Sequence, residues 1–314
     1  MTPQPEGPPD VVAAVVPAFH PGPDLPSLVR DLITQTGGRV VVVDDSGGRP
    51  ADVLATAQGL GALVVRHETN AGIGAALTTG VSAARARWPG LTGVLTVDQD
   101  SRLAPDHLSR LLQAGADGVR VGLQVGLVGP EEVEGLPSRA ARRHHHHRHL
   151  GVLLGREPVQ SGLLVPLTVW EEVGGVDATL FIDGVDSDLW LKVLDSGRQV
   201  VVAPGLRVAH RLGTAEPLVV AGRPLRWRGN ALQVPVSAPF RSYYLVRNRL
   251  LLVARHGCRH PVWAGGQLVG LARHLVLTLL LDPPGRRERL GQVREGLQDA
   301  VRRRAGPSGP RPER

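Results

Sequence analysis

Two carboxylates, one residue apart, follow an apolar run near the middle of the first half of the chain. The run Val94-Leu95-Thr96-Val97 leads directly into Asp98-Gln99-Asp100-Ser101. Apolar, mostly β-branched residues without alternation are typical of a strand that is buried on both faces in a parallel sheet. Open α/β sheets bind ligands at the carboxyl ends of such strands, and two carboxylates at this spacing can share a hard divalent cation and its phosphates. The alternative is a strand that ends in a solvated turn, because short motifs also occur by chance.

A second acidic cluster lies where a loop runs into a predicted helix. Asp183, Asp186 and Asp188 fall within six residues, and apolar side chains that include Phe181 and Trp190 flank them. Such flanks are not those of a solvated acidic face, so we expect Asp186 and Asp188 to point at the positive end of the helix or into a cleft. The alternative is N-capping of the helix by Asp183 or Asp186.

Strands and helices alternate ahead of the first acidic pair. Buried strands are predicted over residues 11–16, 39–43 and 62–66, and helices over residues 24–33 and 51–60; a third helix is entered through the glycines of residues 70–76 and continues to Trp88. This order is typical of the opening of a nucleotide-binding α/β fold. Asp44 follows the second strand, and Asn70-Ala71-Gly72 follows the third. Glycine at the start of a helix permits close backbone approach, and the helix N-terminus can receive a phosphate or a ribose.

The rest of the chain completes an α/β sandwich with a mostly parallel central sheet and helices on both faces. A helix is predicted over residues 106–114, a strand over 119–128, a short helix near 170–172 and a strand over 199–202. Residues 131–158 show no clear period and contain the histidine run 144–149, which we expect to form a mobile loop. From about Tyr243 the pattern predicts a helical C-terminal region.

Composition narrows the partners and the compartment. The chain has 314 residues and a net charge of +7, yet only 3% of its residues are aromatic, so no base-stacking platform for nucleic acid is expected. A single cysteine, Cys258, allows no intramolecular disulfide and favours a reducing, cytoplasmic compartment. The first ten residues lack a signal-peptide pattern. The apolar stretch 262–281, interrupted by Arg273 and His274, predicts an amphipathic or buried helix that could dock peripherally on the inner face of the plasma membrane.

Taken together, the motifs resemble the inverting glycosyltransferases of family 2, which have the GT-A fold, and within them the bacterial rhamnosyltransferase branch. The resemblance covers roughly residues 11–255, and its motifs occur in the family's order. They are Val43-Asp44-Asp45-Ser46, Asn70-Ala71-Gly72-Ile73, Asp98-Gln99-Asp100-Ser101, Gln160-Ser161-Gly162, Phe181-Ile182-Asp183-Gly184-Val185-Asp186, His210-Arg211-Leu212-Gly213 and Tyr243-Tyr244-Leu245-Val246-Arg247-Asn248.

The resemblance implies a Rossmann-like nucleotide-diphospho-sugar transferase fold and a role for each matched residue. Asp44 would bind the nucleobase and ribose, and Asn70, Gly72 and Arg247 would contribute to donor binding. Asp98 and Asp100, with His210, would hold Mg²⁺ or Mn²⁺ against the diphosphate of the donor. Asp186 would be the general base that deprotonates the acceptor hydroxyl. Asp183, Asp188 and Trp190 would complete its surroundings.

The expected reaction moves L-rhamnose from dTDP-L-rhamnose onto a glycan or lipid-linked acceptor in cell wall or polysaccharide biosynthesis. The same fold could instead use a UDP-hexose, or the chain could be a non-catalytic subunit that binds a nucleotide sugar. A nucleotidyltransferase is a weaker alternative, because the loop 18–22 lacks that class's glycine- and arginine-rich signature. The expected domains are a disordered segment 1–10, the transferase domain 11–255 and a helical, basic extension 256–314 with a disordered end.

Overall fold

The computed structural model describes residues 11–48, 52–133, 136–137, 151–210, 215–217, 219–220, 223–224, 226–227, 229–231, 233–235, 238–280 and 286–307. The expectations for residues 1–10 and for the histidine run 144–149 lie outside these ranges. Contacts divide the chain into two compact units. The N-terminal unit consists of residues up to Ala178 together with Val185–Arg211, and the C-terminal unit consists of Thr179–Gly184 together with the residues from Leu212 onward. This division differs from the boundary near residue 255 that the sequence led us to expect.

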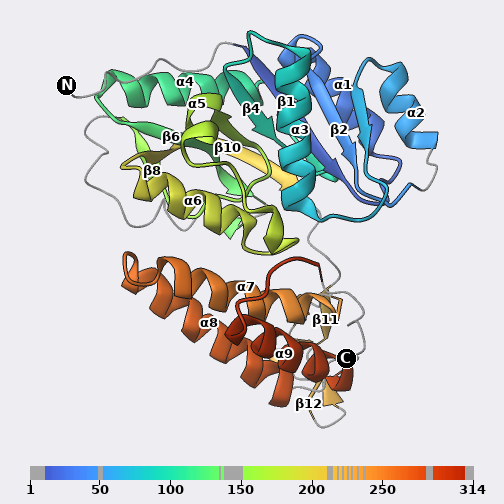
Figure 1. Cartoon of the computed structure of the whole chain (residues 1–314), viewed down its shortest axis with the longest axis vertical. Coiled ribbons are helices and arrows are strands. Elements are labelled where there is room, and N and C mark those ends of the chain that lie inside the picture. Colours follow the sequence, from blue (N-terminus) through green and yellow to red (C-terminus); the bar gives the residue numbers. More distant parts are fainter. Residues whose placement is uncertain are drawn as a thin grey trace. The chain divides into compact units, whose positions relative to one another are not determined.

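The N-terminal unit is built on one mixed sheet with the strand order β3-β2-β1-β4-β9-β6-β10-β5 (Figure 1). Strands β3, β2, β1 and β4 pair in parallel, β9 runs antiparallel to both of its neighbours, and β6 and β10 pair in parallel. The six strands β3, β2, β1, β4, β6 and β10 thus share one direction, as the sequence predicts for the body of the sheet, whereas β5, β7, β8 and β9 run the other way. The strands are β1 Val12–Ala18, β2 Val40–Asp44, β3 Leu63–Arg66, β4 Gly93–Thr96, β5 Ser101–Arg102, β6 Val125–Val133, β7 Leu136–Pro137, β8 Leu153–Gly155, β9 Leu163–Pro166 and β10 Gln199–His210.

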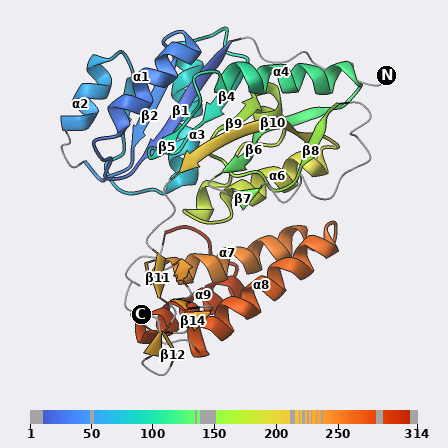
Figure 2. The same ribbon diagram turned by 180° about the vertical axis from the view of Figure 1, so that it is seen from behind.

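Helices cover both faces of this sheet, which is why β1 and β2 are buried along their whole length (Figure 2). Alternate residues of β1, beginning at Val12, share a core with helices α1, α2 and α4. On the other face Val15 and Val43 lie against Gly80 of α3, and Gly126 lies against Val193 of α6. The helices of this unit are α1 Leu25–Thr36, α2 Asp52–Gly59, α3 Ile73–Arg87, α4 His107–Arg120, α5 Leu167–Glu172 and α6 Val185–Asp195.

The strand predicted over residues 119–128 is wrong at its start. Helix α4 continues to Arg120, and β6 begins only at Val125. The physical reason is packing: Gly118, in the last turns of α4, comes so close to the sheet that a β-carbon there would lie 3.0 Å from Cγ2 of both Val125 and Val201. This contact keeps residues near 118 helical in spite of their β-branched neighbours.

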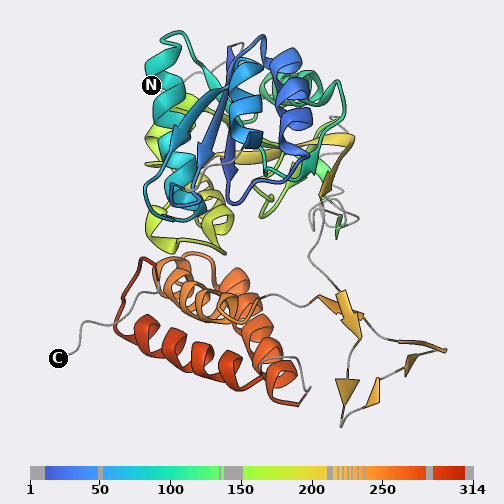
Figure 3. The same cartoon turned by 90° about the vertical axis from the view of Figure 1, so that its right-hand side faces the viewer.

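Among its described residues, the C-terminal unit contains three helices that pack side by side (Figure 3). These are α7 Arg241–His256, α8 Pro261–Leu280 and α9 Arg286–Val301, and they share a small core formed by Val246, Leu271 and Val293. The helical region predicted from about Tyr243 is confirmed. Within the residues described, no helix combines the length and the apolar character needed to cross a membrane. Short strands pair as β11 Ala215–Pro217 with β16 Gln233–Pro235, β12 Val219–Val220 with β13 Arg223–Pro224, and β14 Arg226–Trp227 with β15 Asn230–Ala231.

Candidate active site

The loops that follow the first four parallel strands are joined by hydrogen bonds at the carboxyl edge of the sheet. The side-chain amide of Gln99, after β4, pairs with the backbone of Phe19, after β1, through two hydrogen bonds of 2.9 Å. The backbone N–H of His20 donates to Oγ of Ser46, after β2, at 2.8 Å. The sequence motifs at the ends of β1, β2 and β4 therefore form one rim, which is where a doubly wound sheet binds ligands.

Asp44 places a buried carboxylate at the end of β2. Its side chain is fully buried, and Oδ1 accepts a 3.1 Å hydrogen bond from the backbone N–H of Ser46. The other oxygen, Oδ2, is buried without a hydrogen-bond partner among the described residues. A buried carboxylate oxygen is costly to leave unpaired, so this atom needs a donor, which a water or a ligand can supply.

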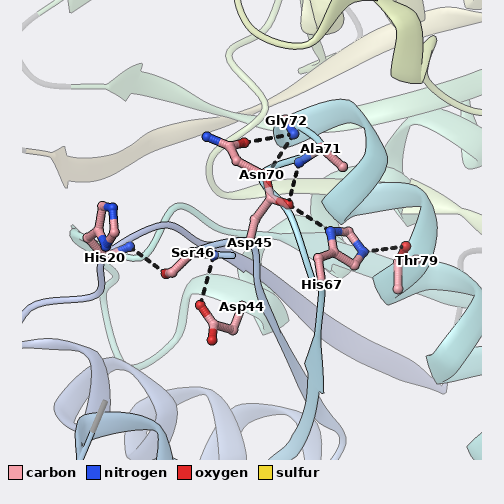
Figure 4. A network of polar contacts seen from close by, with 9 residues as sticks. All are labelled: His20, Asp44, Asp45, Ser46, His67, Asn70, Ala71, Gly72 and Thr79. Atoms are coloured by element: carbon pink, nitrogen blue, oxygen red, sulfur yellow. Dashed lines mark hydrogen bonds and ion pairs between the residues drawn. The ribbon is translucent and has the colours of Figure 1, made fainter. Parts of the chain in front are cut away.

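Asp45 has a different task from its neighbour, because its carboxylate organises the loop after β3 (Figure 4). Oδ1 accepts hydrogen bonds from the backbone N–H of Ala71 at 2.8 Å and contacts Nδ1 of His67 at 2.7 Å, while Oδ2 accepts from the backbone N–H of Gly72 at 2.7 Å. The second ring nitrogen of His67, Nε2, lies 2.9 Å from Oγ1 of Thr79 on α3. One carboxylate therefore ties the end of β2 to the end of β3 and to the start of α3.

The glycine-led start of α3 is shaped by this network. Gly72 is the residue before the helix and has φ 89°, a conformation that favours glycine. Its N–H is engaged by Asp45 and by Oδ1 of Asn70, which lies 3.1 Å away, whereas the Asn70 side chain is otherwise exposed. Gly74, two residues further on, provides the close approach: a β-carbon there would lie 3.0 Å from backbone atoms of Asp177 and Ala178. The roles of Asn70 and Gly72 in donor binding stay predictions.

Asp98 and Asp100 lie directly beyond the end of β4, and the Gln160-Ser161-Gly162 segment holds the first of them in place. The side-chain amide of Gln160 donates to Oδ1 of Asp98, and the backbone N–H of Asp98 donates to Oγ of Ser161 at 3.0 Å. Asp98 is half-buried, and Asp100 is exposed. Two motifs that are about 60 residues apart in the sequence therefore build one corner of the rim.

The donor set at this corner suits a hard divalent cation, because carboxylate oxygens are the ligands that Mg²⁺ and Mn²⁺ prefer. The antiparallel pair β5–β10 sets the backbone of His210 opposite Ser101, the residue after Asp100. The side chain of His210 lies outside the described part of the structure. In the part that is described, no three His, Cys, Asp or Glu side chains form a cluster that could hold a metal ion. The His210 contribution therefore stays a prediction.

Asp186 is the second residue of α6 and is half-buried, and its Oδ1 accepts a 2.9 Å hydrogen bond from the backbone N–H of Ser187. Oγ of Ser187 donates in turn to Glu157 at 2.8 Å. Asp188 is fully buried and forms an ion pair of 2.7 Å with Lys192 one turn later, and Trp190 is buried on the same helix. Of the two carboxylates on this helix, Asp188 therefore serves an internal ion pair, and Asp186 lies nearer the surface.

Two residues singled out in the sequence belong to the C-terminal unit. Asp183 forms an ion pair of 2.5 Å with Arg241, whose pKa is raised by the hydrogen bond from the guanidinium to this carboxylate. Arg247 is buried, and its guanidinium donates to backbone carbonyls of Thr179 and Leu180. The structure therefore directs the Arg247 side chain to the protein's own backbone.

No role was predicted for Asp45, Gln99 or Gln160, although each lies in one of the sequence motifs. Each turns out to support the rim through hydrogen bonds to neighbouring loops. The available signal was that each is a polar residue directly beside an assigned carboxylate or a tight turn. His67 and Thr79 carried no such signal, because only the fold brings them to Asp45.

The sequence matches two families of glycosyltransferases and is similar to proteins of two other organisms. The family described as "Glycosyl transferase family 2" matches residues 13–159, and the family described as "Glycosyl transferase family group 2" matches residues 93–283. The dTDP-rhamnosyl transferase RfbF of Shigella flexneri is 24% identical over 253 residues, which cover 78% of this chain and 80% of that protein. The uncharacterized protein MJ1222 of Methanocaldococcus jannaschii is 26% identical over 129 residues, 41% of this chain and 51% of that protein.

A solved structure extends the likeness to almost the whole fold. Residues 1–349 of TarS from S. aureus share 12% sequence identity with this chain at a TM-score of 0.54, with 93% of this chain and 81% of that one covered. The GT-A fold expected from the sequence is thereby confirmed. Together with the rim of polar loops and the profile match over residues 93–283, this establishes that the chain is a glycosyltransferase and belongs to the family 2 group.

Proposed function

We propose that this glycosyltransferase moves L-rhamnose from dTDP-L-rhamnose to a hydroxyl of a glycan or lipid-linked acceptor, with inversion at the anomeric carbon. The observation that carries the donor class is Oδ2 of Asp44, a buried acceptor without a partner among the described residues at the carboxyl edge of the sheet. The N3–H of a pyrimidine base is a donor that would satisfy it. Thymine and uracil both offer this group, so the base contact does not distinguish dTDP-rhamnose from a UDP-hexose. The choice of dTDP-rhamnose is supported only by the likeness to the dTDP-rhamnosyl transferase.

The reaction is a single displacement. The acceptor oxygen forms a bond to the anomeric carbon while the bond from that carbon to the diphosphate oxygen breaks, and the nucleoside diphosphate leaves. Asp186 accepts the proton of the acceptor hydroxyl. A well-placed general base accelerates such a reaction by roughly 10²–10⁴-fold. Asp98 and Asp100, joined by His210, would hold Mg²⁺ or Mn²⁺, which supplies neutralisation of charge on the departing diphosphate.

The C-terminal helices supply a surface for a membrane-bound acceptor. Helix α8 exposes Val262, Leu268, Val269 and Val276, with fractional exposures of 85%, 46%, 71% and 49%. Exposed arginines, including Arg259 and Arg273, lie on or beside the same helix. An apolar stripe with basic neighbours is suited to the interface of a membrane with anionic lipids. We therefore propose peripheral contact with the inner face of the plasma membrane.

The first experiment measures binding and hydrolysis of dTDP-rhamnose, UDP-glucose and UDP-galactose with Mg²⁺, with Mn²⁺ and with EDTA. We expect metal-dependent selection of dTDP-rhamnose that is lost in Asp98→Ala and Asp100→Ala. Preference for a UDP-hexose would retain the mechanism and discard the rhamnosyl assignment. Binding of no donor at all would favour the non-catalytic subunit.

The second experiment tests the general base. Asp186→Asn should bind the donor as the wild type does but lose transfer by at least about 100-fold. Asp117→Asn, which removes a surface carboxylate paired with Arg120 at 2.6 Å, is the matched control and should transfer normally. Normal transfer by Asp186→Asn would remove the proposed base.

A further inference from the structure

Asp98 and Asp100 lie in one tight turn of the N-terminal unit. The backbone N–H of Ser101 donates to the carbonyl oxygen of Asp98 at 3.0 Å, which closes the four residues 98–101 as a β-turn. Asp98 is the first residue of this turn and Asp100 is the third. Whatever holds the turn to the rim therefore also holds the backbone from which both carboxylates extend.

The hydroxyl of Ser161 contacts both ends of this turn. Its Oγ accepts a hydrogen bond of 3.0 Å from the backbone N–H of Asp98, and it lies 2.7 Å from Oγ of Ser101. A serine hydroxyl has one donor and two acceptor sites, so it can make these two bonds at once. Ser161 is fully buried and Ser101 is only 3% exposed, so bulk water does not compete for these bonds. One hydroxyl thus ties the first and the last residue of the turn to the segment that leads into β9.

The backbone that carries Ser161 is fixed by the last residue of β4. The N–H of Gly162 donates to the carbonyl oxygen of Thr96 at 2.7 Å. The buried hydroxyl of Thr96 lies within hydrogen-bond distance of the carbonyl oxygens of Gln160 and Leu163. Thr96 therefore holds the chain on both sides of Ser161.

Gly162 turns the chain directly after Ser161, with φ of 76°. Its carbonyl oxygen accepts a hydrogen bond of 3.1 Å from Nε2 of His107, the fully buried first residue of α4. A β-carbon at position 162 would lie 2.8 Å from Cγ2 of Val208 in β10 and 3.0 Å from Nε2 of His107. Both the left-handed conformation and the lack of space require glycine here. The hydroxyl of Ser161 is therefore aimed by a backbone that has little freedom to move.

Two further attachments hold single residues of the turn. The side-chain amide of Gln99 pairs with the backbone of Phe19, and Ser101 lies opposite His210 where β5 pairs with β10. Ser161, in contrast, contacts two of the four residues. All of these residues belong to the N-terminal unit. The position of the turn within this unit thus depends on the Ser161 hydroxyl more than on either of the other attachments.

We propose that Ser161 is a positioning residue for the divalent cation, because it holds the turn that presents Asp98 and Asp100 to the metal. The inference rests on the proposed function, which gives these two carboxylates the task of holding Mg²⁺ or Mn²⁺. Hydrogen bonds behind metal ligands orient the ligands, and their loss lowers metal affinity or activity by about 10–100-fold. Loss of the Ser161 hydroxyl should therefore weaken metal binding in a protein that is still folded.

The test compares Ser161→Ala with Thr36→Val by titration with Mn²⁺. Both variants remove a buried hydroxyl, but that of Thr36 donates to the carbonyl of Leu32 within α1 and touches no part of the turn. Electron paramagnetic resonance measures free Mn²⁺ in the presence of dTDP or UDP, whichever the wild type binds. We expect the Kd for Mn²⁺ to rise by about 10–100-fold in Ser161→Ala and to stay at the wild-type value in Thr36→Val.

Turnover at a series of Mn²⁺ concentrations gives a second readout. In Ser161→Ala the concentration that gives half-maximal turnover should rise by the same factor as the Kd, while turnover at saturating Mn²⁺ largely recovers. A merely structural role would lower the amount of folded enzyme and leave the metal dependence unchanged. Reduced turnover at every Mn²⁺ concentration, with an unchanged half-maximal concentration, would therefore overturn the positioning role.

A milder variant keeps the proposal testable if Ser161→Ala does not fold. Ser101→Ala removes one contact of Ser161 and leaves its bond to the N–H of Asp98, so the Kd for Mn²⁺ should rise by a smaller factor. Wild-type Mn²⁺ affinity in Ser161→Ala, or in Ser101→Ala where the first variant does not fold, would overturn positioning.

Asp98→Ala separates the positioning role from the proposed function beneath it. Loss of Mn²⁺ binding in Asp98→Ala beside wild-type affinity in Ser161→Ala overturns positioning alone. Wild-type Mn²⁺ affinity in Asp98→Ala overturns the metal assignment itself, and with it the positioning role. Weakened binding in both variants, with Thr36→Val unchanged, is the expected result.

Discussion

Oδ1 of Asp45 lies 2.7 Å from Nδ1 of His67, and the opposite nitrogen of the same ring reaches Thr79 of α3. Because Asp45 also accepts two backbone N–H groups, this chain of contacts fixes the loop in front of α3. The neighbouring Asp44 keeps one oxygen without a partner among the described residues. Of these two adjacent carboxylates, Asp45 therefore supports the loop, and Asp44 offers an oxygen that can accept a hydrogen bond.

This division predicts the effect of Asp45→Asn. The substitution removes the charge and replaces one accepting oxygen with an NH₂ group. We therefore expect the free energy of unfolding to fall by about 2 kcal/mol and the affinity for the sugar donor to fall. Thr79→Val, which removes only the outermost contact, should cost about 1 kcal/mol or less. Urea denaturation and donor titration measure both quantities. Unchanged stability together with unchanged donor affinity in Asp45→Asn would contradict the supporting role.

Burial of His107 predicts a pH dependence of stability. The side chain is fully buried, its Nε2 lies 3.1 Å from the carbonyl oxygen of Gly162, and burial lowers its pKa below the ordinary value of 6.5. As the pH falls below 6.5, the imidazole of His107 gains a proton more readily in the unfolded chain than in the folded chain. The contribution of this residue to stability is therefore present above pH 6.5 and is lost as the pH falls. The slope is at most about 1.4 kcal/mol per pH unit.

The comparison that isolates this contribution is between wild type and His107→Asn. As the pH is lowered from about 7.5 to about 5, the stability advantage of the wild type over the variant should shrink. His20→Asn, at an exposed position, controls for the loss of a histidine as such. Urea denaturation across this pH range supplies the data, and parallel curves for wild type and His107→Asn would refute the prediction.

The close contact between α3 and the sheet predicts that Gly80→Ala destabilises the fold. The added methyl group would overlap Cγ1 of Val15 and lie 3.2 Å from Cγ2 of Val43, so overpacking should lower stability by about 1–3 kcal/mol in spite of alanine's better helix propensity. Gly265→Ala on α8, where nothing lies within 4 Å, is the matched control and should stabilise by up to about 1 kcal/mol. Thermal unfolding of the two variants measures the difference. Equal shifts of the melting temperature would show that α3 has room for a methyl group at position 80.

The exposed stripe of α8 predicts binding to anionic vesicles. The full chain should sediment with vesicles of phosphatidylglycerol and phosphatidylcholine, and less with phosphatidylcholine alone, because the stripe has arginine neighbours. The double variant Val262→Asp with Val269→Asp should abolish sedimentation. Ala55→Asp with Gln58→Asp adds the same charge to exposed positions of α2 and should leave it intact. Equal losses of sedimentation in the two double variants would show that net charge, and not the apolar stripe, determines vesicle binding.

The strands of the first half could be predicted from the sequence because their signal is local. Runs such as Val40–Val43 are apolar and β-branched without alternation, and only a doubly covered strand suits them. The end of α4 was missed because the contact that decides it, between Gly118 and residues of β6 and β10, joins parts of the chain that are distant in sequence. Local propensity cannot report such a contact.

The candidate site shows the same limit. Asp44 and Asp98 could be proposed as site residues because a carboxylate at the end of a buried strand is a local pattern. The sequence suggests donor binding for Arg247 but cannot show what this side chain contacts, since an arginine that meets a phosphate and one that meets backbone carbonyls look alike in the sequence. Only the geometry shows Arg247 turned to the carbonyls of Thr179 and Leu180.

The contacts of residues 179–184 with α7 also bear on how the chain is made. Residues 179–184 leave the ribosome well before α7, and the carbonyl of Thr179 further accepts a hydrogen bond of 2.6 Å from the backbone N–H of Gly306. Domains fold as they are synthesised, so the sheet can form while the turn before α6 still has no partner. Residues 179–184 therefore gain the partners seen in the structure only after α7 and Gly306 have been synthesised.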